Sequence, residues 1–190
     1  MEKVQCKTFV CRSWKAKTVA AVLAVVAAVA FPQVFHLLGM VSNMGTTLGE
    51  TFLPMHIAIF LVAFFAGPWA GVAAGFVSPA VSFGLTTLMG QPMPTAVMLP
   101  YMMIELAVYG LTTGLLASTK LPSIATLLLA QVAGRGVRAF AIVIGVYLFS
   151  SPMKVAVIWN SVVAGLPGLI LQWILVPLLV FYVERKAKHE

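Results

Sequence analysis

Residues 96–118 read AVMLPYMMIELAVYGLTTGLLAS, an apolar run long enough to cross a bilayer, with one charged side chain, Glu105, near its middle. A second apolar run, residues 124–149, carries Arg135 and Arg138 in the same way. Charging a side chain near the bilayer centre costs at least about 2.5–3.5 kcal/mol, so such residues face the protein interior and mark a ligand or ion pathway by default. The two runs therefore predict a polytopic membrane protein with a polar site in its core.

The rest of the chain is equally apolar, since 61% of its residues are hydrophobic and 9% are charged. Segments of about 20 apolar residues match a hydrocarbon core of roughly 30 Å. We expect a compact all-α bundle of six transmembrane helices, at residues 19–38, 53–66, 69–89, 96–118, 124–149 and 155–183. The second segment is short and contains Pro54, so it can stop short of a full crossing.

The net charge of +7 is concentrated at the chain ends, which orients the bundle. The basic residues at the two ends are Lys3, Lys7, Arg12, Lys15, Lys17, Arg185, Lys186 and Lys188. By the positive-inside rule both termini are cytoplasmic, which requires an even number of spans. We divide the chain into a basic N-terminal segment (1–17), a membrane domain (18–183) and a basic tail (184–190). Lys120 falls on the cytoplasmic side, whereas Lys154 is a lone positive charge in an outer loop.

A stripe of small side chains marks the first span, where Ala16, Ala20, Ala24 and Ala28 recur every four residues. Such a stripe lets another helix approach closely in lipid. The stripe is either a docking surface for a partner or part of the internal packing, and the spacing alone does not separate the two.

Three glycines, Gly67, Gly71 and Gly75, form a second stripe at the start of the third span. Pro68 marks a tight turn beside it, so internal packing is the favoured interpretation there.

Depth along the helices predicts which polar residues meet. At about 1.5 Å per residue, Glu105 lies roughly 15 Å from the outer face and Arg135 roughly 17 Å from the inner face, so the two share a level. Arg138, one turn outward, is level with Asn160, which either forms a hydrogen bond to a ligand or joins helices. Two interpretations of this cluster are open. In the first, Glu105 and Arg135 neutralise each other and hold two helices together. In the second, the cluster binds a solute, because two arginines face one deep glutamate and one of them lacks a partner.

Weaker candidates surround this cluster. Gln172 is expected to join helices by hydrogen bonding. The further residues that we consider for ligand contact or for lining a mouth are Tyr109, His56, Trp159, Met55, Met93 and Met98.

Several motifs are absent from the sequence. It has no GxxxxGK[ST] phosphate loop, no GxSxG and no HExxH, so we expect neither ATP hydrolysis nor another catalytic activity. Cys6 and Cys11 form a weak metal signal without a second pair. We therefore expect no metal site and no cofactor.

Four local strings resemble a known family. They are LPMHI at 53–57, AGPWAG at 66–71, IELAVYG at 104–110 and GR at 134–135. In this order, and together with the alanine stripe and the basic ends, they resemble the substrate-binding S component of energy-coupling factor (ECF) vitamin transporters. The similarity extends over residues 16–183, nearly the whole chain.

The resemblance implies a function that composition does not reveal. Such an S component binds a vitamin at the outer face of a prokaryotic plasma membrane, with the vitamin as cargo rather than cofactor. It docks through the alanine stripe onto a transmembrane coupling subunit, which two cytoplasmic ATPases drive. The binding site of the family lies in the outer halves of the fourth to sixth helices. Vitamin B6 forms, pantothenate and a cobalamin or its precursor are all candidate cargoes.

Two other functions remain open from the sequence. One is a self-sufficient secondary transporter in which Glu105 couples transport of a small polar solute to protons. The other is a non-transporting scaffold in which the buried charges serve only the structure.

Overall fold

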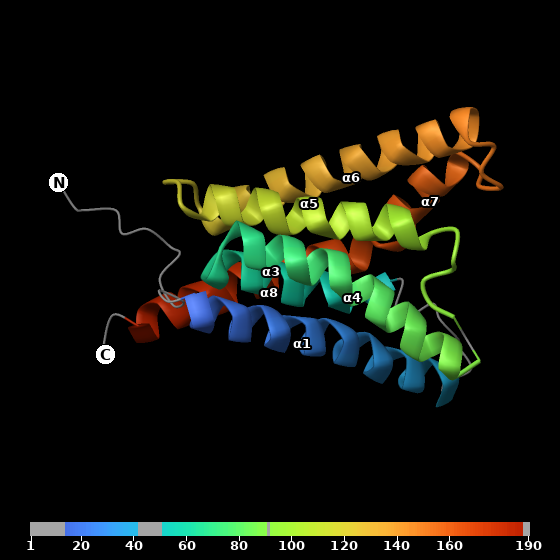
Figure 1. Ribbon diagram of the computed structural model, residues 1–190. Coiled ribbons are helices and arrows are strands. Elements are labelled where there is room, and N and C mark those ends of the chain that lie inside the picture. The colour runs from blue at the N-terminus through green and yellow to red at the C-terminus, as the bar shows by residue number, and fades with distance from the viewer. Residues whose placement is uncertain (1–13, 42–50, 91, 188–190) are drawn as a thin grey trace.

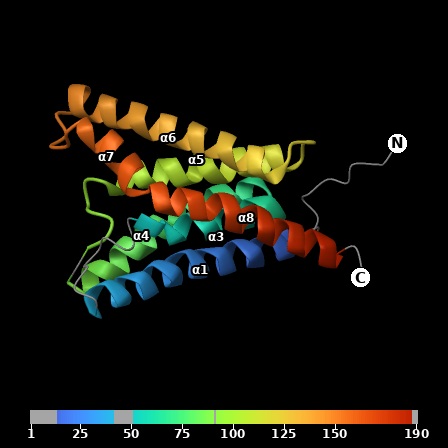
Figure 2. The same cartoon turned by 180° about the vertical axis from the view of Figure 1, so that it is seen from behind.

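A computed structural model describes residues 14–41, 51–90 and 92–187, and every regular element in these ranges is helical (Figure 1). The helices are α1 (Trp14–Val41), α3 (Pro54–Ala66), α4 (Pro68–Leu88), α5 (Leu99–Ala117), α6 (Ser123–Leu148), α7 (Ala156–Ala164) and α8 (Leu166–Ala187). They form one elongated bundle in which α1 and α6 lie on opposite sides, with α3, α4, α5 and α8 between them (Figures 1 and 2).

Four helices are long and apolar enough to cross a membrane: α4, α5, α6 and α8. The apolar part of α1, Thr18–Val34, is shorter. These helices confirm a multi-pass helical membrane protein, while the predicted count of six complete crossings stays a prediction.

The short helix α3 occupies the centre of the bundle, and ten of its 13 residues are buried. At about 1.5 Å per residue it spans only roughly 20 Å, less than a hydrocarbon core. It begins at Pro54, after Leu53 in a left-handed conformation with φ of 49°, and it ends at Gly67 with φ of 92°. The expectation that this segment stops short of a crossing agrees with the structure.

The sixth predicted span, residues 155–183, is not one helix. It is broken at Gly165 into α7 and α8. In a continuous helix the ring of Pro167 would clash with the carbonyl of Val163, and proline has no N–H to donate. Gly168 follows it and packs against the backbone of residues 51 and 52, so the chain bends where these small and cyclic residues cluster.

Glycines bring α4 and α5 into the most extensive helix contact of the described elements. A Cβ atom on Gly71 would lie 2.8 Å from the Cα atom of Gly110, and one on Gly75 would lie 2.3 Å from the carbonyl oxygen of Leu106. One on Gly114 would lie 2.3 Å from the backbone nitrogen of Pro68. The predicted internal packing of the glycine stripe is confirmed for Gly71 and Gly75, whereas no atom lies within 4 Å of a Cβ added to Gly67.

The alanine stripe of α1 also faces inward over its described part. Ala28 is fully buried, Ala24 is 9% exposed, and both belong to the same hydrophobic core as α3. Ala20 is half-buried against that core, and the side chain of Ala16 lies outside the described part of the structure. Because a partner cannot reach a buried methyl group, Ala24 and Ala28 do not form an open docking surface in this conformation. Docking through α1 itself stays a prediction.

The basic residues at the helix ends are unevenly distributed between the two ends of the bundle. The start of α1, the α5–α6 connection with Lys120 and the end of α8 with Arg185 and Lys186 lie at one end (Figures 1 and 2). The α6–α7 connection with Lys154 lies at the other end. The placement of Lys120 at the same end of the bundle as the basic C-terminal turn is the arrangement that the positive-inside rule requires of a cytoplasmic face (Figures 1 and 2).

We predict that Gly75→Ala lowers the midpoint of thermal unfolding in detergent. Its new methyl group would overlap the Leu106 carbonyl, and overpacking of this kind costs about 1–3 kcal/mol. Gly84→Ala is the matched control on the same helix, because no atom lies within 4 Å of its added Cβ. Equal effects of the two substitutions would contradict the close α4–α5 contact.

Candidate functional site

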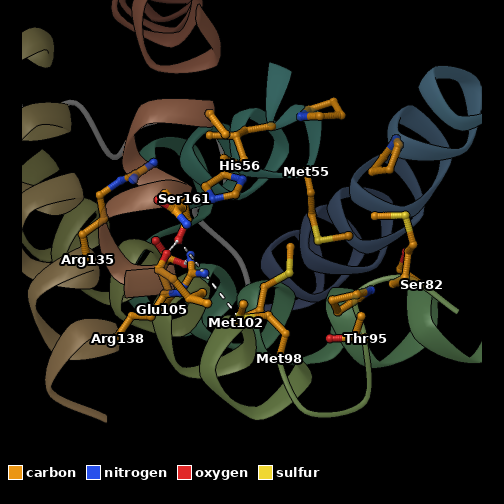
Figure 3. Close-up of a pocket in the computed structure, with 18 residues that line it drawn as sticks. Met55, His56, Ser82, Thr95, Met98, Met102, Glu105, Arg135, Arg138 and Ser161 are labelled. Atoms are coloured by element: carbon orange, nitrogen blue, oxygen red, sulfur yellow. Dashed lines mark hydrogen bonds and ion pairs between the residues drawn. The ribbon is translucent and has the colours of Figure 1, made fainter. Parts of the chain in front are cut away.

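A cavity of about 370 Å³ lies in the half of the bundle away from the basic end. Its wall is formed by the first turn of α3, the outer half of α5, the middle of α6 and α7, with single residues from α1 and α4 (Figure 3). The 92–98 connection closes one side. The first turn of α3, which begins at Pro54, lines the cavity with Pro54, Met55 and His56.

Glu105 is the buried charge at the centre of the wall, at 1% exposure. Its Oε2 atom accepts from Arg138 Nη1 at 2.8 Å, and its Oε1 atom accepts from the Tyr109 hydroxyl at 2.7 Å. Both carboxylate oxygens are therefore engaged within the protein. Tyr109 is fully buried and acts behind the wall rather than on it, because it does not line the cavity.

The predicted pairing of Glu105 with Arg135 is wrong. The helix that carries Glu105 begins at Leu99 rather than at residue 96, so Glu105 lies about 4.5 Å nearer the outer end than the sequence indicated. That distance corresponds to nearly one helical turn, which is also the separation of Arg135 from Arg138. The carboxylate thus meets Arg138, while Gly134 packs against the Tyr109 ring one turn deeper.

Arg138 joins three helices. Besides the ion pair to α5, its Nη2 atom donates to Met98 Sδ and to Ser161 Oγ, both at 3.3 Å. The Ser161 hydroxyl in turn donates to the carbonyl of Val157 within α7. Both terminal nitrogens of Arg138 therefore have partners, whereas its Nε atom is buried without one among the described residues. Ser161, which sequence reasoning missed, is the residue of α7 that Arg138 contacts.

Arg135 has no hydrogen-bond or ion-pair partner among the described residues. Its Nε atom is buried without an acceptor, and its side chain lines the cavity. A Cβ atom on Gly165 would lie 3.5 Å from Arg135 Nη2, so the guanidinium reaches the break between α7 and α8. Figure 3 shows it extending toward Ser161 and His56.

His56 lines the cavity from the first turn of α3 and is only 3% exposed. Its ring packs against the Tyr109 ring, with centroids 5.4 Å apart and an interplanar angle of 52°. The Nδ1 atom is buried and has no partner among the described residues. Three described residues that line the cavity thus carry a buried polar side-chain atom without a partner: His56 at Nδ1, and Arg135 and Arg138 at Nε.

Of the two candidate ligand contacts on α7, one lines the cavity and the other does not. Asn160 lines the cavity, as expected for a ligand contact. Trp159 lies outside the wall, and its side chain is 71% exposed. Consecutive residues of an α-helix point about 100° apart, so a helix that turns Asn160 toward the cavity turns Trp159 away from it. Trp159 therefore does not line the cavity, and a contact of its side chain with a ligand stays a prediction.

Methionines make up much of the apolar wall. Met55, Met93 and Met98 line the cavity, in agreement with their predicted place at a mouth, and Met102 joins them. Met102 was missed, although it stands four residues after Met98 and so lies on the same helical face. Flexible thioethers adapt to irregular shapes and contact aromatic rings favourably.

Two hydrogen-bonded groups hold the wall in place. Thr86 on α4 accepts from Met93 N at 2.8 Å and donates to Met93 O at 3.0 Å, which fixes the 92–98 connection. Deeper in the bundle, Gln131 donates to Gln172 at 2.9 Å and accepts from Trp173 at 2.6 Å. Gln172 is fully buried, and its predicted role in joining helices is confirmed.

A multi-pass helical bundle around a charged cavity of this size defines a membrane protein that binds a small molecule. The family assignment agrees with that class. A family model described as ECF transporter, substrate-specific component, matches residues 15–180, and the chain belongs to this family. It is a membrane-embedded substrate-binding subunit and not an enzyme. Neither the curated proteins nor the solved structures yielded a match.

We predict that Glu105→Ala destabilises the protein by about 3–5 kcal/mol, because it leaves Arg138 buried without its counter-ion. Replacing both partners, Glu105→Met with Arg138→Met, should cost much less than the two single substitutions combined, since no uncompensated charge remains. Unfolding in mixed micelles measures Glu105→Ala, the two single methionine substitutions and the double substitution. Additive losses would show that the two side chains do not form a pair.

Proposed function

We propose that this subunit binds a small water-soluble vitamin or vitamin precursor at the outer face of a prokaryotic plasma membrane. It then works with an ECF module, composed of a transmembrane coupling subunit and two ATPases. The observation that carries this proposal is the cavity of about 370 Å³ that holds a satisfied ion pair and an unpaired arginine inside an apolar bundle. Family membership supports the partner module.

The charge distribution supports capture from outside. The end with Lys120, Arg185 and Lys186 is the cytoplasmic end by the positive-inside rule, and the cavity lies in the opposite half. A solute that reaches the cavity by the shorter path therefore comes from the outer face.

The size of the cavity narrows the cargo. Binding pockets of proteins range over about 300–1,000 Å³, so a cavity of about 370 Å³ stands near the lower limit. Vitamin B6 forms and pantothenate are compact molecules of suitable size. A cobalamin, with its corrin macrocycle and nucleotide arm, is too large for it.

A proton-coupled secondary transporter is less well supported. A coupling carboxylate must gain and lose a proton during each cycle. Glu105 instead has both oxygens engaged, one by Arg138 and one by Tyr109, and protonating it would break the ion pair. These contacts favour a structural and positioning role for Glu105.

Transport in proteoliposomes tests the proposal. We expect uptake of pantothenate or a vitamin B6 form only when this chain is reconstituted with an ECF module and ATP. Uptake should be lost when the phosphate-loop lysines of both ATPases are replaced, and it should persist when the proton gradient is collapsed. Uptake by this chain alone, driven by an imposed proton gradient, would contradict the proposal.

A further inference from the structure

The charges of the cavity wall leave one positive charge without a counter-ion. Among the described residues that line it, Glu105, Arg135 and Arg138 are the charged ones. Glu105 and Arg138 neutralise each other at 2.8 Å, and the second oxygen of Glu105 is held by Tyr109. With His56 neutral, the wall carries a net single positive charge, located on Arg135.

The chain offers few other acids that could neutralise Arg135. It contains five acidic residues, all of them glutamates: Glu2, Glu50, Glu105, Glu184 and Glu190. Glu184 lies near the end of α8, at the opposite end of the bundle. Glu50 lies outside the described residues and is therefore included in the test below.

The environment of Arg135 makes a single anionic group its natural partner. Buried charges in proteins are paired, because an unpaired charge in an apolar interior is costly. A guanidinium presents a planar fork of donors that matches a carboxylate in bidentate geometry. Arg135 has a buried Nε atom without an acceptor, and the cavity beside it is otherwise lined largely by methionine, proline and small side chains.

Resting on the proposed function, we propose that the cargo is an organic monoanion whose carboxylate is bound by Arg135. Its apolar or aromatic body packs against Met55, Met98 and Met102, and His56 Nδ1 pairs with a hydroxyl or amide group of the ligand. The Glu105–Arg138 pair positions the wall and sums to zero charge, so it does not bind the anion. Neutral, cationic and doubly charged solutes are poor ligands, because each leaves a charge uncompensated inside the cavity.

Arg135, rather than Arg138, then determines which ligand charge the cavity prefers. A carboxylate on a bound ligand would remove the one uncompensated charge of the wall. An equivalent neutral amide or alcohol would not. Selectivity of this kind follows from leaving a buried group unpaired with the wrong ligand.

The test requires no prior identification of the ligand. A bacterial metabolite extract is separated at neutral pH by ion exchange into cationic, neutral, singly anionic and multiply anionic pools. The thermal unfolding midpoint of the purified full chain in detergent is then measured with each pool, because a ligand that binds only the folded state raises that midpoint. We expect the singly anionic pool to give the largest rise.

Variants locate the charge that is responsible. For Arg135→Gln we expect the amount of the singly anionic pool needed for half-maximal stabilisation to rise roughly 10- to 100-fold, the loss expected for charge-assisted hydrogen bonds. Its unfolding midpoint without ligand should not fall, because the substitution removes a partly buried charge that has no partner among the described residues. Lys154→Gln removes the same charge from an exposed loop outside the cavity wall and is expected to leave binding unchanged.

The remaining outcomes separate this proposal from the function on which it rests. A larger rise of the unfolding midpoint with the neutral, cationic or multiply anionic pool, or an unchanged ligand requirement in Arg135→Gln, would overturn the monoanion proposal and leave the solute-binding function standing. A neutral preference that changes to monoanions in Glu50→Gln would also overturn it, by identifying Glu50 as the counter-ion of Arg135. Stabilisation by no pool would contradict the solute-binding function itself.

Discussion

The buried ion pair between Glu105 and Arg138 is the interaction on which the site depends. A carboxylate at 1% exposure inside an apolar bundle requires a counter-ion, and Arg138 supplies it while also bonding to Met98 and Ser161. These contacts hold α5, α6 and α7 in one arrangement around the cavity. In the proposal made above, they also influence what the cavity binds, because Arg138 is held by Glu105 and Arg135 has no partner among the described residues.

The space for a ligand arises from backbone geometry. Helix α3 begins halfway along the bundle, and the α7–α8 segment bends at Gly165, so neither fills the outer half completely. Below this level the bundle is tightly packed, with glycines of α4 and α5 in direct backbone contact and Gln131 joined to Gln172. A rigid lower half thus supports an open upper half, which suits a subunit that must bind a solute without coming apart.

Much of this organisation could be predicted from the sequence, because it depends on the residue types and on their spacing along the chain. The apolar segments, the short second segment, the glycine packing and the location of a charged site in the core all follow from residue type and spacing. Methionines at a cavity mouth and the helix-joining role of Gln172 were also predictable. Each of these predictions depends on the residue type and does not require the exact height of the residue along the bundle axis.

Other features required three-dimensional information. Arg135 was predicted as the partner of Glu105, whereas the observed partner, Arg138, lies one helical turn nearer the outer end. The reason is that an error of three residues in the predicted helix start displaces a side chain by about 4.5 Å along the helix axis. The inward face of the alanine stripe could not be known, since small residues suit internal packing and docking equally. Trp159 was placed at the site for its proximity in sequence to Asn160, although neighbours on a helix point in different directions. The break at Gly165 was missed, even though Pro167 is a signal for it.

The most direct test of the account is mass spectrometry of small molecules released from this chain after purification without added ligand. The measurement should compare the natural chain with Ala164→Trp. Ala164 lines the cavity, so the indole of the variant would occupy part of the cavity volume. The account predicts a near-stoichiometric small solute from the natural chain and little from the variant. Equal amounts from both, or no solute from a natural chain that also fails to bind any pool of cellular metabolites, would show that the cavity around Arg135 is not a binding site.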